Sequence, residues 1–88
     1  MYRLTVMLSE DRKKGRIHRE KSMEGEDRSD LQKNILPMIE ELAKKDDFKT
    51  PTAEYIIEKD GMYLDGDVDI RVKITRNGVS AKLGSLLI

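Results

Sequence analysis

The chain lacks several residue types that would point to a particular chemistry. Its 88 residues include no cysteine and no tryptophan, and only three tyrosines and one phenylalanine. Without cysteine there can be no disulfide, no thiolate nucleophile and no zinc site built on sulfur. No apolar run approaches the roughly 20 residues that a membrane-spanning helix needs. The composition therefore favours a soluble domain with a thin core.

An excess of charge of either sign is also missing. The 17 basic and 17 acidic residues cancel, so no general attraction to nucleic acid or anionic lipid is expected, although local patches remain possible. A chain of this length typically forms one domain, and we predict a single domain over residues 1–88. Met1 leads directly into a strand pattern rather than into a basic-then-apolar signal segment, so we expect a cytoplasmic protein.

The strongest positive signal is an alternating pattern near the C-terminus. Apolar side chains occupy every second position on either side of Asn77-Gly78, namely Val68, Ile70, Val72, Ile74, Val79, Ala81 and Leu83. Alternation with period two places one set of side chains on a buried face. Asn-Gly between two such runs favours a type I′ turn, in which both central residues have positive φ. The pattern predicts an antiparallel hairpin.

Other segments predict the remaining elements. Alternation over residues 2–8 indicates a first strand, and residues 53–58 and 62–64 indicate two more. Turns are expected at residues 59–61 and at Asp65-Gly66. One helix is indicated by an apolar stripe with helical spacing, formed by Leu31, Ile35, Met38, Ile39 and Leu42. The expected order is β-β-α-β-β-β, an α+β domain in which one helix packs on one face of an antiparallel sheet of four to five strands.

The helix raises two local questions. Ser29-Asp30-Leu31-Gln32 has the form of a capping box, which predicts Ser29 as the N-cap. Pro37 lies within the apolar stripe, and a proline inside a helix removes a hydrogen bond. Two outcomes are open: a bent helix over residues 30–46, which the long stripe favours, or a main helix that begins near Asn34 with Pro37 in its first turn.

A charged segment separates the first strand from the helix. Residues 10–28 are expected to form either an exposed hairpin arm, with residues 16–23 returning along the first strand, or a mobile loop. Seven basic side chains gather in this segment and are the candidate partner-binding residues: Arg12, Lys13, Lys14, Arg16, His18, Arg19 and Lys21. Such charge runs are common on solvated surfaces and indicate a function only weakly.

Two kinds of binding are compatible with this arm. We expect a small non-enzymatic interaction protein that binds or inhibits a protein partner through the arm or a sheet edge, since recognition needs only a rigid frame and a few contact residues. The alternative is a nucleic-acid-binding protein with the cations of residues 12–21 on phosphates. No aromatic residue is interleaved for base stacking, and the acids within residues 24–27 weaken this alternative. An uncovered edge strand also makes a homodimer possible.

Signatures of catalysis, cofactors and metals are lacking. His18 is the only histidine, and no nucleophile elbow, phosphate-binding loop or dinucleotide fingerprint is present. A calcium loop beginning at Asp65 would need a glycine and a bidentate acid where the chain has Ile70 and Arg76. We therefore expect no enzyme activity, no cofactor, no metal and no membrane partner.

The apolar tail, Leu83 and residues 86–88, is expected either to pair with the first strand or to lie along an open edge.

Overall fold

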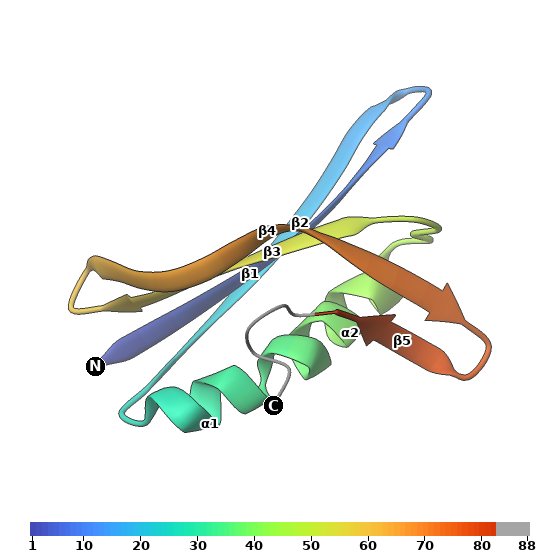
Figure 1. Cartoon of the computed structure of the whole chain (residues 1–88). Helices are drawn as coiled ribbons and strands as arrows, with labels where there is room; N and C mark the ends of the chain where they lie inside the picture. The colour runs from blue at the N-terminus through green and yellow to red at the C-terminus, as the bar shows by residue number, and fades with distance from the viewer. Residues whose placement is uncertain (83–88) are drawn as a thin grey trace.

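Five antiparallel strands and one bent helix make up this computed structural model, which describes residues 1–82 (Figure 1). The sheet order is β2-β1-β3-β4-β5. In chain order the elements are β1 (Tyr2–Arg12), β2 (Gly15–Gly25), α1 (Arg28–Lys33), α2 (Ile35–Lys45), β3 (Thr52–Lys59), β4 (Met62–Thr75) and β5 (Gly78–Ala81). The predicted α+β class and element order are confirmed. The expectation for the apolar tail falls on residues outside the described part of the chain.

The core lies between the helix and one face of the sheet. Alternate residues of β1 and β3 point toward the helix and are buried, as the period-two pattern predicts. The strands contribute Leu4, Val6, Leu8, Ala53, Tyr55 and Ile57 to this layer. The helix contributes the predicted stripe of Leu31, Ile35, Met38, Ile39 and Leu42, each at most 4% exposed. One two-layer core therefore absorbs the apolar side chains of both patterns.

The helix bends at Asn34, which ends α1 and begins α2. Asn34 N donates to Leu31 O at 2.9 Å, and Asn34 O accepts from Met38 N at 2.9 Å. Pro37 is the third residue of α2, where the first-turn N–H groups have no helical acceptor within that segment. The two alternatives left open by the sequence therefore combine: the helix is long and bent, and Pro37 lies in the first turn of its second segment.

The helix begins earlier than the capping-box pattern predicts. Asp27, not Ser29, is the N-cap of α1, and its Oδ1 accepts from Ser29 N at 2.8 Å. The prediction for Ser29 is wrong because an aspartate two residues earlier caps the same helix end and adds a favourable charge at the positive end of the helix dipole.

This assignment predicts unequal effects of two alanine substitutions. Asp27→Ala should lower the free energy of unfolding by about 1 kcal/mol, the usual effect of losing an N-cap. Ser29→Ala should change it by less than about 0.5 kcal/mol, as for an exposed residue with no special role. Equilibrium unfolding in urea measures both. A larger loss for Ser29→Ala than for Asp27→Ala would contradict the assigned cap.

Strand β4 differs most from its sequence-based prediction. It is one strand of 14 residues, and Asp65-Gly66 lies inside it rather than at a turn. Its pairing with β3 shifts register twice, and Asp69 at one shift has a positive φ of 55°. Each shift inserts one extra residue on β4, which is the geometry of a β-bulge. The alternation therefore restarts, so Ile70 and Val72 are buried whereas Val68, predicted to be buried with them, is 61% exposed.

β4 has a hairpin turn at each end. The β3–β4 turn uses the predicted residues, and the β4–β5 turn does not. At the β3–β4 turn, Asp60 and Gly61 both have positive φ, consistent with the turn predicted at residues 59–61. At the β4–β5 turn, Thr75 pairs with Gly78, so the tip is Arg76-Asn77. Asn77 does not have positive φ, and the predicted type I′ turn on Asn77-Gly78 is wrong, although the hairpin forms. Asn77 N instead donates to Thr75 Oγ1 at 3.2 Å.

Candidate functional site

The charged segment of residues 10–28 folds mostly as a hairpin. β1 continues to Arg12, Lys13 and Lys14 form the turn, and β2 pairs with β1 over its whole length. The arm projects beyond the other strands at one end of the molecule (Figure 1). Five of the seven candidate residues thus lie on a regular strand pair, and the pairing register sets their direction, whereas Lys13 and Lys14 lie at the turn.

Two of these cations attach the arm to the helix. Arg19 and Lys21 lie opposite the buried Leu8 and Val6, so they point to the helix side of the sheet. Arg19 Nε lies 2.6 Å from an oxygen of Asp46, and Lys21 Nζ lies 2.5 Å from Glu41. Hydrogen bonding from Lys21 and its charge lower the pKa of Glu41 below its usual value. Both cations are therefore neutralised within the chain.

Arg12 and Arg16 also have partners in the chain. Arg12 Nε lies 2.9 Å from Glu10, its Nη2 donates to Asp47 O, and its guanidinium lies over the Phe48 ring. Arg16 donates to the Ser9 hydroxyl at 2.8 Å.

The other three candidates are exposed: Lys13, Lys14 and His18. Their side chains form no hydrogen bond or ion pair with residues 1–82. The seven predicted residues therefore do not converge on one site.

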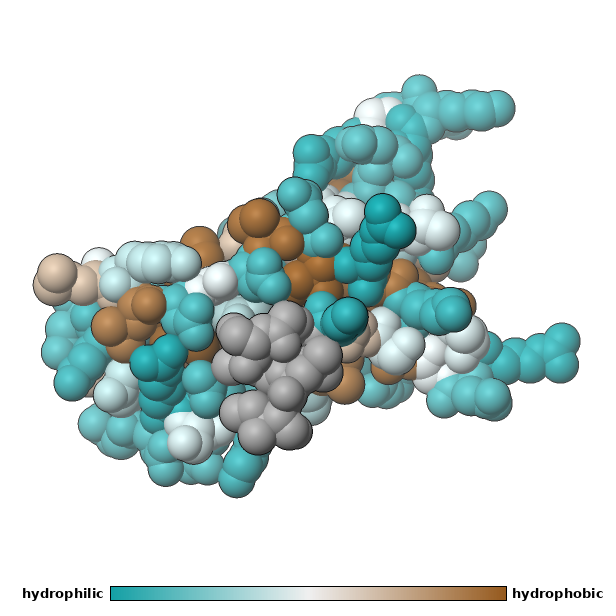
Figure 2. Space-filling model, viewed as in Figure 1, coloured by the Kyte–Doolittle hydropathy of each residue, from teal (hydrophilic) through white to brown (hydrophobic). Residues whose placement is uncertain are grey.

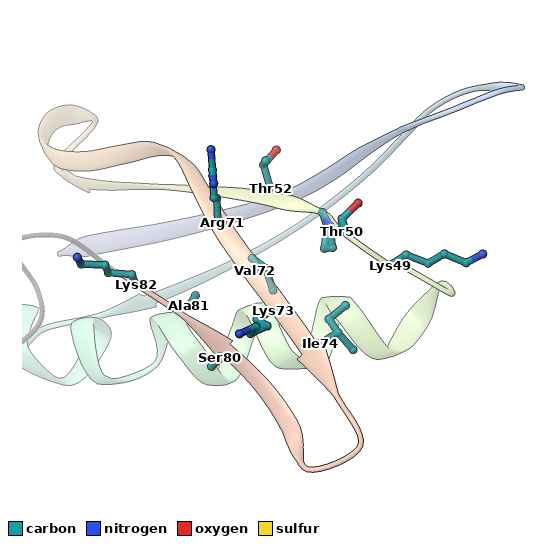
Figure 3. A pocket seen from close by; sticks show the side chains of 11 residues that line it. Lys49, Thr50, Thr52, Arg71, Val72, Lys73, Ile74, Ser80, Ala81 and Lys82 are labelled. Carbon is teal, nitrogen blue, oxygen red and sulfur yellow. The ribbon is translucent and has the colours of Figure 1, made fainter.

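A hollow that the sequence did not suggest opens where β4 leaves β3. The last hydrogen bond at this point runs from Val72 N to Pro51 O at 3.3 Å. Beyond it β4 bends away and runs with β5 beside α2 (Figure 1). The divergence leaves an open notch of about 850 Å³, seen in Figure 3. Its floor is apolar and is made by Pro51, Val72, Ile74 and Ala81.

The rim of this notch is basic. Lys49, Arg71, Lys73 and Lys82 line it, with the hydroxyl groups of Thr50, Thr52 and Ser80. Figure 3 shows Lys49 and Lys82 at opposite ends of the notch and Lys73 between them. Within residues 1–82, none of the four cations forms an ion pair and no acidic residue lines the notch. Because these cations have no counter-charge among the described residues, they give the notch a positive local potential.

The notch joins apolar and charged surface on one side of the molecule. Figure 2 shows apolar surface in the middle of this view, bordered by hydrophilic side chains that project outward. A concave, apolar floor with a few polar groups around it is the usual form of a binding site. The arrangement suits an anionic ligand that also has apolar groups to bury.

Sequence reasoning missed this site because it depends on tertiary structure. Its residues come from three separate stretches, 49–52, 71–74 and 80–82. Arg71 and Lys73 alternate with Val72 and Ile74, a pattern that also describes the solvated face of an ordinary strand. Only the bend in β4 brings Lys49 and Lys82 to the same hollow. The alternating pattern of residues 71–74 was thus visible in the sequence, but the sequence did not show that the three stretches meet at one hollow.

Other kinds of site find no support in the described part of the chain. Among residues 1–82, no three histidine, aspartate or glutamate side chains come together as metal ligands would. Neither α1 nor α2 has the length and apolar character needed to cross a bilayer. Comparison with protein-family models, curated proteins and solved structures found no match to this chain.

Proposed function

We propose that this chain is a small non-enzymatic binding protein whose notch receives an extended acidic segment of a protein partner. The observation that carries the proposal is the set of four cations around an apolar floor, with no carboxylate among the described residues that line it. Carboxylates attract such cations, and side chains of the same segment gain by burying apolar surface on the floor. A cytoplasmic setting, in keeping with the absence of cysteine, is part of the same proposal.

The backbone of β4 supports an extended partner. β3 pairs with β4 as far as Arg71, and β5 pairs with residues 72–75 on the opposite side. Residues 73–75 therefore have a strand neighbour on one side only among the described residues. Open strand edges bind extended peptides through main-chain hydrogen bonds, while alternate side chains of the peptide point in opposite directions. Alternating acidic and apolar residues would fit the rim and the floor.

A nucleic acid is the competing ligand, since phosphates also bind clustered cations. Single-stranded nucleic acids gain much of their binding energy by stacking bases on aromatic side chains, and no aromatic residue of the described part of the chain lines the notch. The apolar floor would give a phosphate backbone nothing to bind. These two features favour an acidic protein segment.

A binding assay with defined probes tests the proposal. Three fluorescent probes are used: a synthetic peptide of alternating glutamate and leucine, the same peptide with serine for leucine, and a single-stranded DNA. We expect the glutamate–leucine peptide to bind most tightly, because only it offers both carboxylates and apolar side chains. Lys73→Glu combined with Lys82→Glu should weaken its binding at least about tenfold, since two attractive contacts become repulsive.

The matched control reverses two cations on the arm. Lys13→Glu combined with Lys14→Glu makes the same charge change on exposed residues and should leave peptide binding within about twofold. An equal loss from this variant would move the site to the arm and overturn the notch. Tighter binding of the DNA, with log affinity falling linearly with log salt concentration, would establish the nucleic-acid alternative instead.

A further inference from the structure

Strand β2 forms a long open edge of the sheet. It is 11 residues long, pairs with β1 along one side without a bulge, and has no strand on its other side within residues 1–82. Most natural edge strands are short, bulged or interrupted by proline, because an open edge is a template for another chain. β2 contains no proline, and its only glycines are at its two ends. Among the described residues, charged side chains are the only protection of this edge.

The direction of its backbone groups follows from the pairing. Met1 O accepts from Asp60 N at 3.2 Å, so the odd-numbered residues of β1 bond toward β3. Because bonding alternates along an antiparallel strand, the even-numbered residues of β1 bond toward the odd-numbered residues of β2. The even-numbered residues of β2 therefore direct their N–H and C=O groups away from the sheet. These outward residues are Arg16, His18, Glu20, Ser22 and Glu24.

We propose that β2 pairs antiparallel with β2 of a second copy of this chain, about a two-fold axis at Glu20. Glu20 is the central residue of Gly15–Gly25, so this register gives the longest overlap. It brings the outward backbone groups of the two copies face to face, as one continuous sheet requires. The resulting contact is isologous, the commonest form of homodimer.

The side chains of β2 are complementary in this register. Arg16 faces Glu24 of the second copy on the open side of the sheet, and by symmetry the pair occurs twice. On the helix side Ile17 faces Met23 of the second copy, also twice, and both residues are half-buried beside the core. Opposite charges and apolar pairs directly across two strands stabilise a sheet. A shift by two residues would instead place Arg19 against Arg19 or Lys21 against Lys21.

Two pairs of like charges oppose this contact, and the charges of one pair are already neutralised within each chain. Arg19 faces Lys21 of the second copy, but each is bound to an acid of its own chain, Asp46 and Glu41. Glu20 faces Glu20 across the axis, and no such acid–base pair relieves it within residues 1–82. This repulsion weakens the dimer.

Sedimentation velocity on the purified chain tests the proposal. The protein concentration is raised from about 10 μM to about 1 mM, a range that detects dissociation constants weaker than micromolar. Over this range the wild type should shift from monomer to dimer. Arg16→Glu should weaken the dimer by about tenfold, because both symmetric pairs become repulsive. Adding Glu24→Arg should restore it, although the ion pairs of Arg16 with Asp11 and of Glu24 with Arg3 within each chain are then lost. Glu20→Gln should tighten the dimer several-fold.

A proline at residue 18 gives a backbone control. The N–H of His18 points outward, so His18→Pro leaves pairing with β1 intact and removes a donor only from the open edge. This variant should keep the wild-type circular dichroism and remain monomeric at every concentration. A wild type that stays monomeric at 1 mM, a folded His18→Pro that dimerises, or a charge exchange that fails to restore dimerisation would each overturn the proposal. The notch lies at the other end of the strand order, so its peptide binding is tested independently.

Discussion

Replacing Gly66 with alanine will lower the free energy of unfolding by about 3 kcal/mol. A Cβ atom built on Gly66 would lie 2.6 Å from the backbone oxygen of Tyr55, and 3.2 Å from the Tyr63 hydroxyl. The exposed Tyr63 ring can move aside, but Tyr55 lies in the centre of the sheet and is 1% exposed. One of the paired strands must therefore shift, and such overpacking usually costs about 1–3 kcal/mol, with backbone displacement at the upper end.

Gly25→Ala is the matched control for this prediction. Its Cβ would meet only the Leu31 side chain, at 3.5 Å, which is ordinary contact. Neither glycine has positive φ, so the comparison isolates steric contact from backbone preference. We expect Gly25→Ala to change stability by less than about 0.5 kcal/mol in guanidinium unfolding. Equal stabilities of the two variants would show that β4 can move away from β3 without a loss in the free energy of unfolding.

Gly66 also shows why β4 was difficult to predict. Asp-Gly is a frequent turn dipeptide, so a turn at Asp65-Gly66 was a reasonable expectation. The structure instead uses this glycine where two backbones approach closely, a second role that has the same local signature. The bulge at Asp69 has no signature either, and it is the reason that Val68 is exposed whereas Ile70 is buried. Periodicity predicts strands well but does not predict where their register breaks.

The helix and the charged arm show a different limit. The spacing of Leu31, Ile35 and Leu42 defined the buried face of the helix correctly, because a single periodic stripe leaves one possible orientation. The candidate cations of the arm could not be sorted in the same way. Whether Arg19 binds a partner or binds Asp46 depends on a residue 27 positions away. Long side chains on a predicted strand can be assigned to a face of the sheet, but their interaction partners can be identified only from the tertiary structure.

Glu10 links the arm to the loop that precedes β3, and its removal should have the second large effect. Its side chain is 8% exposed. One carboxylate oxygen accepts from Arg12 Nε at 2.9 Å, and the other accepts from Lys49 N at 2.9 Å and Thr50 N at 2.6 Å. The same loop supplies Lys49 to the rim of the notch. The carboxylate therefore holds one wall of the proposed binding site.

These contacts set the pKa of Glu10. Burial opposes ionisation, but the hydrogen bonds from Arg12, Thr50 and Lys49, together with the charge of Arg12, outweigh it and lower the pKa below its ordinary value of 4.5. In the unfolded chain the carboxyl group regains that ordinary pKa and binds protons more readily. The stabilisation is therefore fully present above about pH 4.5 and is lost as the pH falls through the lower folded pKa.

Glu10→Ala should lower the free energy of unfolding at pH 7 by about 2–3 kcal/mol, because it removes a charge-assisted contact and leaves two backbone donors without their acceptor. Glu10→Gln keeps the shape but not the charge, so its unfolding free energy should fall less steeply than that of the wild type between pH 5 and about pH 3. Glu41→Gln is the control, since the Glu41 pKa is also lowered, by Lys21, but on exposed surface where ion pairs contribute little. Urea unfolding across this pH range measures all three variants. A Glu10→Gln profile parallel to that of the wild type would show that the Glu10 carboxylate does not hold the loop, and that the wall of the notch is fixed by other contacts.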